Sequence, residues 1–140
     1  MSYDTQFDAF IGLLGAFLSF FLGGLDSLMI VLLVVVGCDM VSGLIKAFIL
    51  KNLSSDVGFH GIARKICMFM IVGIANVIDN QMLGHSEALR DGVIIFYLSS
   101  EGISIFENVI DMGVPVPEWL KERFLTWRNK QLVSKNKPDE

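Results

Sequence analysis

Hydrophobic residues gather into four long runs along this chain, and short polar segments separate the runs. They cover residues 9–25, 28–50, 65–83 and 92–110. Each run has about the length that an α-helix needs to cross a hydrocarbon core of roughly 30 Å. The pattern therefore predicts an all-α integral membrane protein whose four transmembrane helices lie within residues 1–111.

A polar tail, residues 112–140, follows the fourth run. Gly113, Pro115 and Pro117 end the helical pattern, and Pro117 suits the first turn of a new helix. Large apolar side chains then recur on one helical face among basic ones. We therefore predict an amphipathic helix over residues 117–132 that lies on the membrane surface. Its interfacial anchors are expected to be Trp119, Phe124 and Trp127.

Composition agrees with a membrane protein. Hydrophobic residues make up 53% of the 140 residues and charged residues 19%, and the mean hydropathy is +0.58. Ordinary soluble domains have roughly 45 to 50% apolar and about 25% charged residues. The net charge of −4 argues against a nucleic-acid partner.

The positions of lysine and arginine indicate the orientation, because basic residues near spans favour the cytoplasmic side. Lys51, Arg64 and Lys65 flank the second connection, and further basic residues crowd the tail, whereas Arg90 falls on the opposite side. We therefore expect both termini and the loop around Ser54 to be cytoplasmic. The acidic N-terminus leaves open a three-span form with its N-terminus outside.

Two predicted spans carry a carboxylate at their centre, Asp39 in the second and Glu101 in the fourth. An acid at mid-bilayer costs roughly 2.5 to 3.5 kcal/mol, so it must face a partner helix, water or another subunit. If these two spans run in the same direction, Asp39 and Glu101 share one depth, and Lys46 and Glu107 share another. We expect Lys46 and Glu107 to neutralise one another, and the two central acids to take up a proton or stay hydrated.

A polar seam runs along the fourth span at alternating spacings of four and three residues. Its members are Tyr97, Glu101, Ser104, Asn108 and Asp111. A polar seam does not face lipid, so it packs inside the monomer, lines a subunit interface or borders an aqueous path. The third span also has a polar edge, at Asn76 and Asp79, and Asp79 is expected to reach the outer membrane interface.

The first span carries small residues at spacings of three and four. They are Gly12, Gly15, Ser19 and Gly23. Small side chains let helix backbones approach closely in lipid, so this stripe is a candidate surface for helix packing, although glycine is also simply common in membrane helices.

No catalytic or metal-binding constellation emerges. His60 and His85 lie in different predicted loops on opposite sides of the membrane, which argues against a shared metal site. Cys38 and Cys67 lie in or beside spans, where packing is expected rather than a disulfide. The sequence therefore predicts neither an enzyme nor a bound metal or cofactor.

Two segments resemble the toxin-secretion and phage-lysis holin family. Residues 89–123 read LRDGVIIFYLSSEGISIFENVIDMGVPVPEWLKER, and residues 38–66 read CDMVSGLIKAFILKNLSSDVGFHGIARKI. The resemblance covers roughly residues 25–123. The matching positions are Asp39, Gly43, Lys46, Ser54, Ser55, Gly61, Lys65, Glu101, Ser104, Glu107, Asn108, Gly113, Pro115 and Pro117.

This resemblance implies a small holin that accumulates in the bacterial cytoplasmic membrane, forms homo-oligomers and opens lesions in the bilayer. Its functional partner would be a peptidoglycan hydrolase or a large secreted toxin. Two other classes remain open. The acidic seam also suits an ion channel or a proton-coupled transporter subunit, and the basic tail suits a non-conducting membrane adaptor.

Overall fold

The computed structural model describes residues 3–52 and 55–135, and the regular secondary structure within those ranges is α-helical. The expected cytoplasmic loop at Ser54 lies outside the described residues. The helices are α1 (Tyr3–Leu22), α2 (Ser27–Ile49), α3 (Ser55–Met82), α4 (Ala88–Asp111) and α5 (Glu118–Lys135).

Four of these helices are long and apolar enough to cross a membrane. The candidate spans are Thr5–Leu22, Ser27–Ile49, Gly58–Met82 and Ala88–Asp111. The prediction of an all-α integral membrane protein is therefore confirmed, and four helices are candidates for its spans. The predicted polar loop of residues 51–64 is shorter than expected, because α3 already begins at Ser55 and its helix continues through Gly58 and Gly61. Consequently Lys65 lies well inside a helix rather than at its end.

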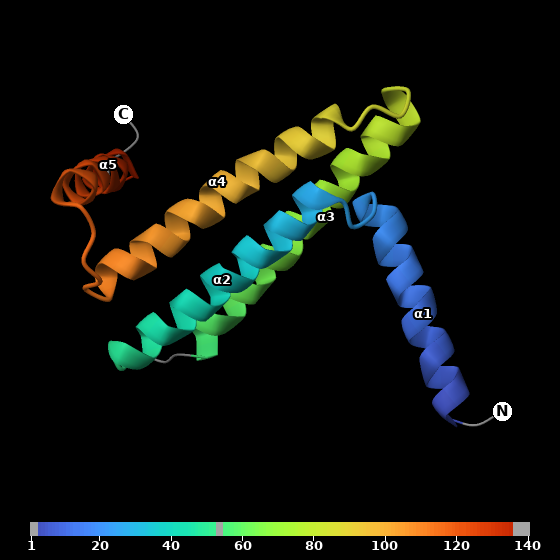
Figure 1. Ribbon diagram of the computed structural model, residues 1–140, viewed down its shortest axis with the longest axis horizontal. Coiled ribbons are helices and arrows are strands. Elements are labelled where there is room, and N and C mark those ends of the chain that lie inside the picture. The colour runs from blue at the N-terminus through green and yellow to red at the C-terminus, as the bar shows by residue number, and fades with distance from the viewer. Residues whose placement is uncertain (1–2, 53–54, 136–140) are drawn as a thin grey trace.

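Helix α4 is the centre of the bundle, since it packs against both α2 and α3. Figure 1 shows these three helices running close together while α1 diverges from them. Their apolar core lies toward the α1–α2 turn. It consists of Met29, Leu32 and Val36 of α2, Met68 and Val72 of α3, and Ile94 of α4.

Burial in this protein differs from burial in a soluble domain, because polar side chains share the interior with apolar ones while large apolar side chains are exposed. Among the described residues, seven buried side chains are hydrophobic and seven are polar or charged. Large apolar side chains such as Phe48 and Phe96 stay exposed on the outside of the bundle. Lipid can cover this apolar exterior, whereas each buried charge needs a partner inside the protein.

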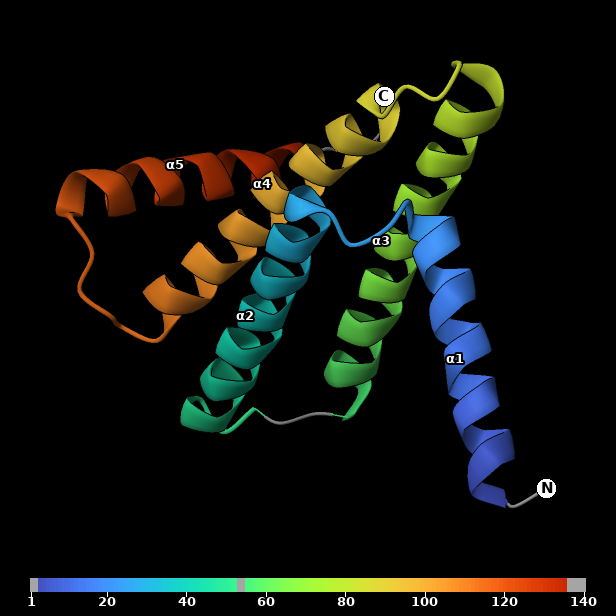
Figure 2. The same ribbon diagram turned by 45° about the vertical axis from the view of Figure 1, so that its right-hand side comes forward.

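Helix α1 is attached at its C-terminal end alone, as Figure 2 shows. The Phe21 ring lies where a β-carbon on Gly73 would be, so only glycine fits at that point of α3. Asn76 Nδ2 donates to the carbonyl oxygens of Phe20 and Phe21 at 3.2 and 3.1 Å. All residues from Thr5 to Phe20 are exposed within the monomer.

A tight turn joins α1 to α2. Gly23 and Gly24 have φ angles of 83° and 89°, a region that glycine enters at little cost. Asp26 then caps α2, because its carboxylate accepts from the Met29 N–H at 3.0 Å. Gly23 therefore belongs to the turn and not to α1, which corrects its expected place in the small-residue stripe of a helix.

Helix α5 follows the break at Gly113, whose φ is 76°. It begins one residue after Pro117, whose carbonyl accepts from the Leu120 and Lys121 N–H groups. The helix turns back beside the C-terminal end of α4 (Figure 2). Phe124 meets Phe106 of α4 edge to face, with ring centroids 5.3 Å apart.

Candidate functional site

Three buried charges meet where α2, α3 and α4 come together. Lys65 Nζ donates to Asp39 Oδ2 at 2.7 Å and also contacts Glu101 Oε2. The three side chains are no more than 8% exposed. We call this set the charged triad. It joins all three core helices with a single ammonium group.

Asn108 extends the charged triad toward the end of α4. Its Nδ2 donates to Ser42 Oγ at 3.0 Å and to Asp39 Oδ1 at 3.4 Å. Its Oδ1 accepts from Lys46 Nζ at 3.2 Å. Asn108 thus links the charged triad to a second group of charges one helical turn away.

That second group, the inner cluster, consists of Lys46, Glu107, Asp111 and Arg128. Lys46 Nζ lies 2.9 Å from Asp111 Oδ2, and Arg128 of α5 lies 3.3 Å from Asp111 and 3.6 Å from Glu107. The expected pairing of Lys46 with Glu107 is therefore wrong within the monomer. Matched depth alone did not decide the partner, because Asn108 and Asp111 face α2 whereas Glu107 points toward α5.

The ion pair between Lys46 and Asp111 should contribute to the stability of the folded protein. We expect a double-mutant cycle of Lys46→Met with Asp111→Leu to give a coupling of about 1 kcal/mol, because both groups are only partly screened by solvent. The cycle of Lys46→Met with Glu107→Leu serves as the control and should give a smaller coupling. Unfolding by sodium dodecyl sulfate from mild detergent micelles measures both. Equal couplings would contradict the observed pairing.

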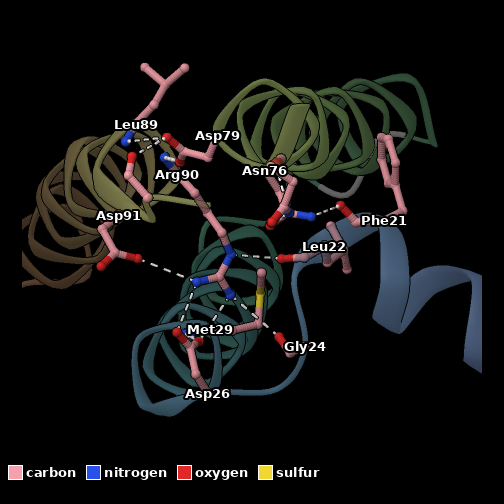
Figure 3. Close-up of polar contacts among 12 residues, drawn as sticks. Phe21, Leu22, Gly24, Asp26, Met29, Asn76, Asp79, Leu89, Arg90 and Asp91 are labelled. Atoms are coloured by element: carbon pink, nitrogen blue, oxygen red, sulfur yellow. Dashed lines mark hydrogen bonds and ion pairs between the residues drawn. The ribbon is translucent and has the colours of Figure 1, made fainter. Parts of the chain in front are cut away.

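A third polar group lies at the opposite end of the bundle, around the fully buried Arg90 (Figure 3). Its guanidinium donates to both carboxylate oxygens of Asp26 at 2.8 and 3.0 Å and to Asp91 at 3.3 Å. It also donates to the carbonyl oxygens of Leu22 and Gly24. Arg90 therefore fastens the α1–α2 turn to the start of α4.

The carboxylate of Asp26 is stabilised by this arrangement. Hydrogen bonds from Arg90, together with the Met29 N–H, hold the pKa of Asp26 below its ordinary value despite partial burial. The stability that this carboxylate adds is therefore present above its unfolded pKa and is lost as the pH falls through the lowered value.

Asp79, which is expected at the outer membrane interface, lies near the end of α3, beside the connection to α4. Its side chain is buried and accepts from the N–H groups of Leu89 and Arg90 at 3.3 and 2.7 Å and from Ser86 Oγ at 3.1 Å. Free N–H groups at a helix start favour a nearby carboxylate. Asp79 of α3 therefore caps α4 across the connection between the two helices.

The acidic groups beside Arg90 are a poor metal site. Asp26, Glu87 and Asp91 have carboxylate oxygens within 4.8 Å of one another. However, Arg90 already engages two of these carboxylates. A cation would have to displace that guanidinium, so the geometry favours the ion pairs.

The remaining predicted residues lie on the outside of the monomer or near it. Gly12 and Gly15 have open space beside them, and Ser19 is exposed. Trp119 and Trp127 are exposed, whereas Phe124 packs on Phe106 instead of lying free for lipid. On α4, Ser104 and Glu107 are partly buried while Glu101 and Asn108 are buried.

The sequence pattern missed the two cations that organise the interior. Lys65 was assigned to a membrane edge and Arg90 to an outer loop, yet both are buried. One signal was available for Lys65: two uncompensated acids at mid-membrane require a cation, and Lys65 lies three turns before Asn76 on one predicted helix.

The site can exchange partners without exposing unpaired groups to lipid. It offers carboxylates, an ammonium group, an amide and a hydroxyl, all on the inner faces of α2, α3 and α4. Within the described residues, no buried side-chain nitrogen or oxygen lacks a hydrogen-bond partner. If the helices rotate or separate, the same groups can bind water or another subunit, which is the chemistry of a polar path through a membrane.

Comparison with known proteins gives consistent matches. The bacteriophage holin family matches residues 16–129. An uncharacterized protein of Listeria innocua is 43% identical over 131 residues, which cover 92% of this chain and 93% of that protein. An uncharacterized protein of Listeria monocytogenes is 42% identical over 125 residues, 89% of each chain. A probable holin of Bacillus phage phi105 is 35% identical over 85 residues, 61% of this chain and 62% of that protein. No solved structure matches.

Proposed function

This chain belongs to the bacteriophage holin family, and on that premise we propose that it works as a holin in a bacterial cytoplasmic membrane. Copies of the chain would associate there and open lesions that release a peptidoglycan hydrolase or a large toxin. The family match over residues 16–129 is the observation that carries this proposal. The relative from Bacillus phage phi105, itself described as a probable holin, supports it.

The inside-out distribution of polarity gives this function a physical basis. A lesion wall needs one polar and one apolar surface, and the monomer buries several polar and charged side chains while many large apolar side chains of its spans are exposed. If copies associate and the core helices turn outward, the charged triad and Asn108 become the polar lining. The polar side chains that are buried in the monomer would then line the lesion in the oligomer.

Co-expression with a cell-wall hydrolase that has no secretion signal tests the function. We expect cells with both proteins to lyse abruptly, and cells with the hydrolase alone to stay intact. Cells with the chain alone should lose viability without lysis. A hydrolase that leaves the cell equally fast without the chain would overturn the proposal. In the chromosome or phage genome, a neighbouring hydrolase or toxin gene would identify the cargo.

Both termini are expected on the cytoplasmic side, because an even number of spans leaves them together and the tail is basic. Single cysteines at Ser2, which lies outside the described residues, at His85 and at Gln131 test this in a background without Cys38 and Cys67. An impermeant thiol reagent applied to intact cells should label His85→Cys alone. Labelling of Ser2→Cys would support the three-span form, and labelling of Gln131→Cys would reverse the whole orientation.

Self-association is expected to use α1, which has few contacts within the monomer. Gly12, Gly15 and Ser19 offer the close approach that helix association in lipid requires. We expect Gly15→Leu to reduce crosslinked oligomers in membranes, since the larger side chain keeps the helices apart. Two further variants serve as controls: Gly24→Ala changes the α1–α2 turn, and Leu13→Ile changes the face of α1 away from the glycines. Unchanged crosslinking of Gly15→Leu would move the interface elsewhere, first to the polar seam of α4.

A further inference from the structure

The two groups of charges in the core differ in their net charge when all of their members are ionised. The inner cluster holds two cations, Lys46 and Arg128, against two carboxylates, Glu107 and Asp111. It is therefore neutral when every member is ionised. The charged triad holds two carboxylates and one ammonium group, so full ionisation would leave one negative charge in the middle of the bundle.

The surroundings offer no cation to compensate that charge. Among the described residues, the groups that act on Asp39 are Lys65 of α3 and Glu101, Ser104 and Asn108 of α4. Lys65, which also contacts Glu101, is the one cation in this set. The next cation along the polar core is Lys46, which Asp111 and Asn108 already engage. The Asp39 and Lys65 side chains are each 8% exposed and that of Glu101 is 6% exposed, so water screens the excess charge poorly.

We propose that the charged triad is a proton-binding site that holds one proton in the packed state, shared by the Asp39 and Glu101 carboxylates. A proton makes the set neutral, which a buried group in a membrane strongly favours. Lys65 contacts both carboxylates, so the two acids share one cation and, in the packed state, one proton. A proton bound by two coupled carboxylates belongs to the pair and not to one residue.

Proton binding would also regulate the opening of the bundle, a step that rests on the proposed holin function. Release of the proton leaves a net negative charge among α2, α3 and α4. That charge weakens their packing and favours a hydrated arrangement. The closed form is therefore favoured while the proton is bound, and opening is favoured as the pH rises and the proton leaves.

Infrared spectroscopy of the purified full-length chain counts this proton directly. The carbonyl stretch of a protonated carboxyl group absorbs at a higher wavenumber than the bands of amides and carboxylates. A maltoside detergent contributes no carbonyl band of its own. At neutral pH we expect one protonated carboxyl group per chain, with a band that shifts in heavy water. We expect no protonated carboxyl group in Asp39→Asn or Glu101→Gln, because each variant leaves one carboxylate paired with the Lys65 ammonium group. We expect two in Lys65→Met, where both acids lack a cation.

Asp111→Asn is the matched control, because Asp111 already lies between Lys46 and Arg128 and should not affect the band. Absence of the band in the wild-type protein, or its persistence in Glu101→Gln and Asp39→Asn, would overturn the proposal. If circular dichroism shows that Lys65→Met does not fold, the other four proteins still decide the result. The proton count requires no lysis, so a positive count with failed lysis would reject the holin function alone.

Discussion

Replacing Lys65 with methionine is expected to cost about 3 kcal/mol of tertiary stability, the lower end of the range for removing one partner of a buried ion pair. Among the described residues, Lys65 is the one cation that contacts both central acids, so its loss leaves Asp39 and Glu101 buried without a cation. Uptake of protons by the two acids limits the cost. Unfolding by sodium dodecyl sulfate from maltoside micelles, followed by tryptophan fluorescence, measures it.

The neighbouring residue provides the control for this prediction. Arg64 is exposed and of the same charge, so Arg64→Met should change stability by no more than about 0.5 kcal/mol. Lys65→Arg keeps the charge and should recover part of the loss. A Lys65→Met protein as stable as the wild type, or one no less stable than Arg64→Met, would mean that the charged triad does not hold the core helices together.

Removing the ionisable group of Glu101 is expected to impair opening and leave insertion intact. Glu101→Gln and Glu101→Leu should reach the membrane at normal levels, since both lower the cost of burial. Release of a co-expressed hydrolase should be at least about tenfold slower, which corresponds to about 1.4 kcal/mol in the barrier. Leucine should be the worse of the two, because glutamine can still accept from Lys65.

Ser99→Ala is the control for this experiment. Ser99 is exposed on α4, and its hydroxyl bonds the carbonyl of Ile95 within its own helix. Immunoblots of isolated membranes give the amount of each variant, and the optical density of the culture gives the time of lysis. Normal lysis by Glu101→Leu would show that Glu101 is a tolerated interior residue. Asp39 or the tail would then be the candidate for the group that opening requires.

The four spans could be predicted because long apolar runs determine membrane crossing almost independently of tertiary packing. The same holds for the inward face of α4, where a seam spaced at three and four residues brought Glu101 and Asn108 into the interior. The general rule that acids in a membrane need a partner was therefore a reliable guide to this helix.

Partner identity could not be predicted in the same way. Lys46 was matched to Glu107 by depth, yet the seam itself contained Asn108 and Asp111, which are the residues that Lys46 contacts. Rotation about the helix axis decides such a contact, and depth does not report it. Residues 51–64 were assigned to a polar loop with two glycines, yet residues 55–64 are the first turns of α3.

The hydrogen bonds of Arg90 with the α1–α2 turn could not be predicted from the sequence. Its partners come from the α1–α2 turn and from the start of α4, more than 60 positions apart along the chain. A turn whose backbone carbonyls face a guanidinium depends on two glycines with positive φ angles and on the placement of Asn76. Those features appear only once the helices have packed.

Release of markers of graded size from lipid vesicles distinguishes a holin from a selective channel and from an adaptor. The purified chain is reconstituted into vesicles that contain a small dye together with dextrans as large as a cell-wall hydrolase. We expect the large dextrans to escape together with the dye, and Glu101→Leu to retain both. Escape of ions or dye alone would identify a selective channel, and complete retention by the wild-type protein would identify an adaptor; either result would contradict the holin function.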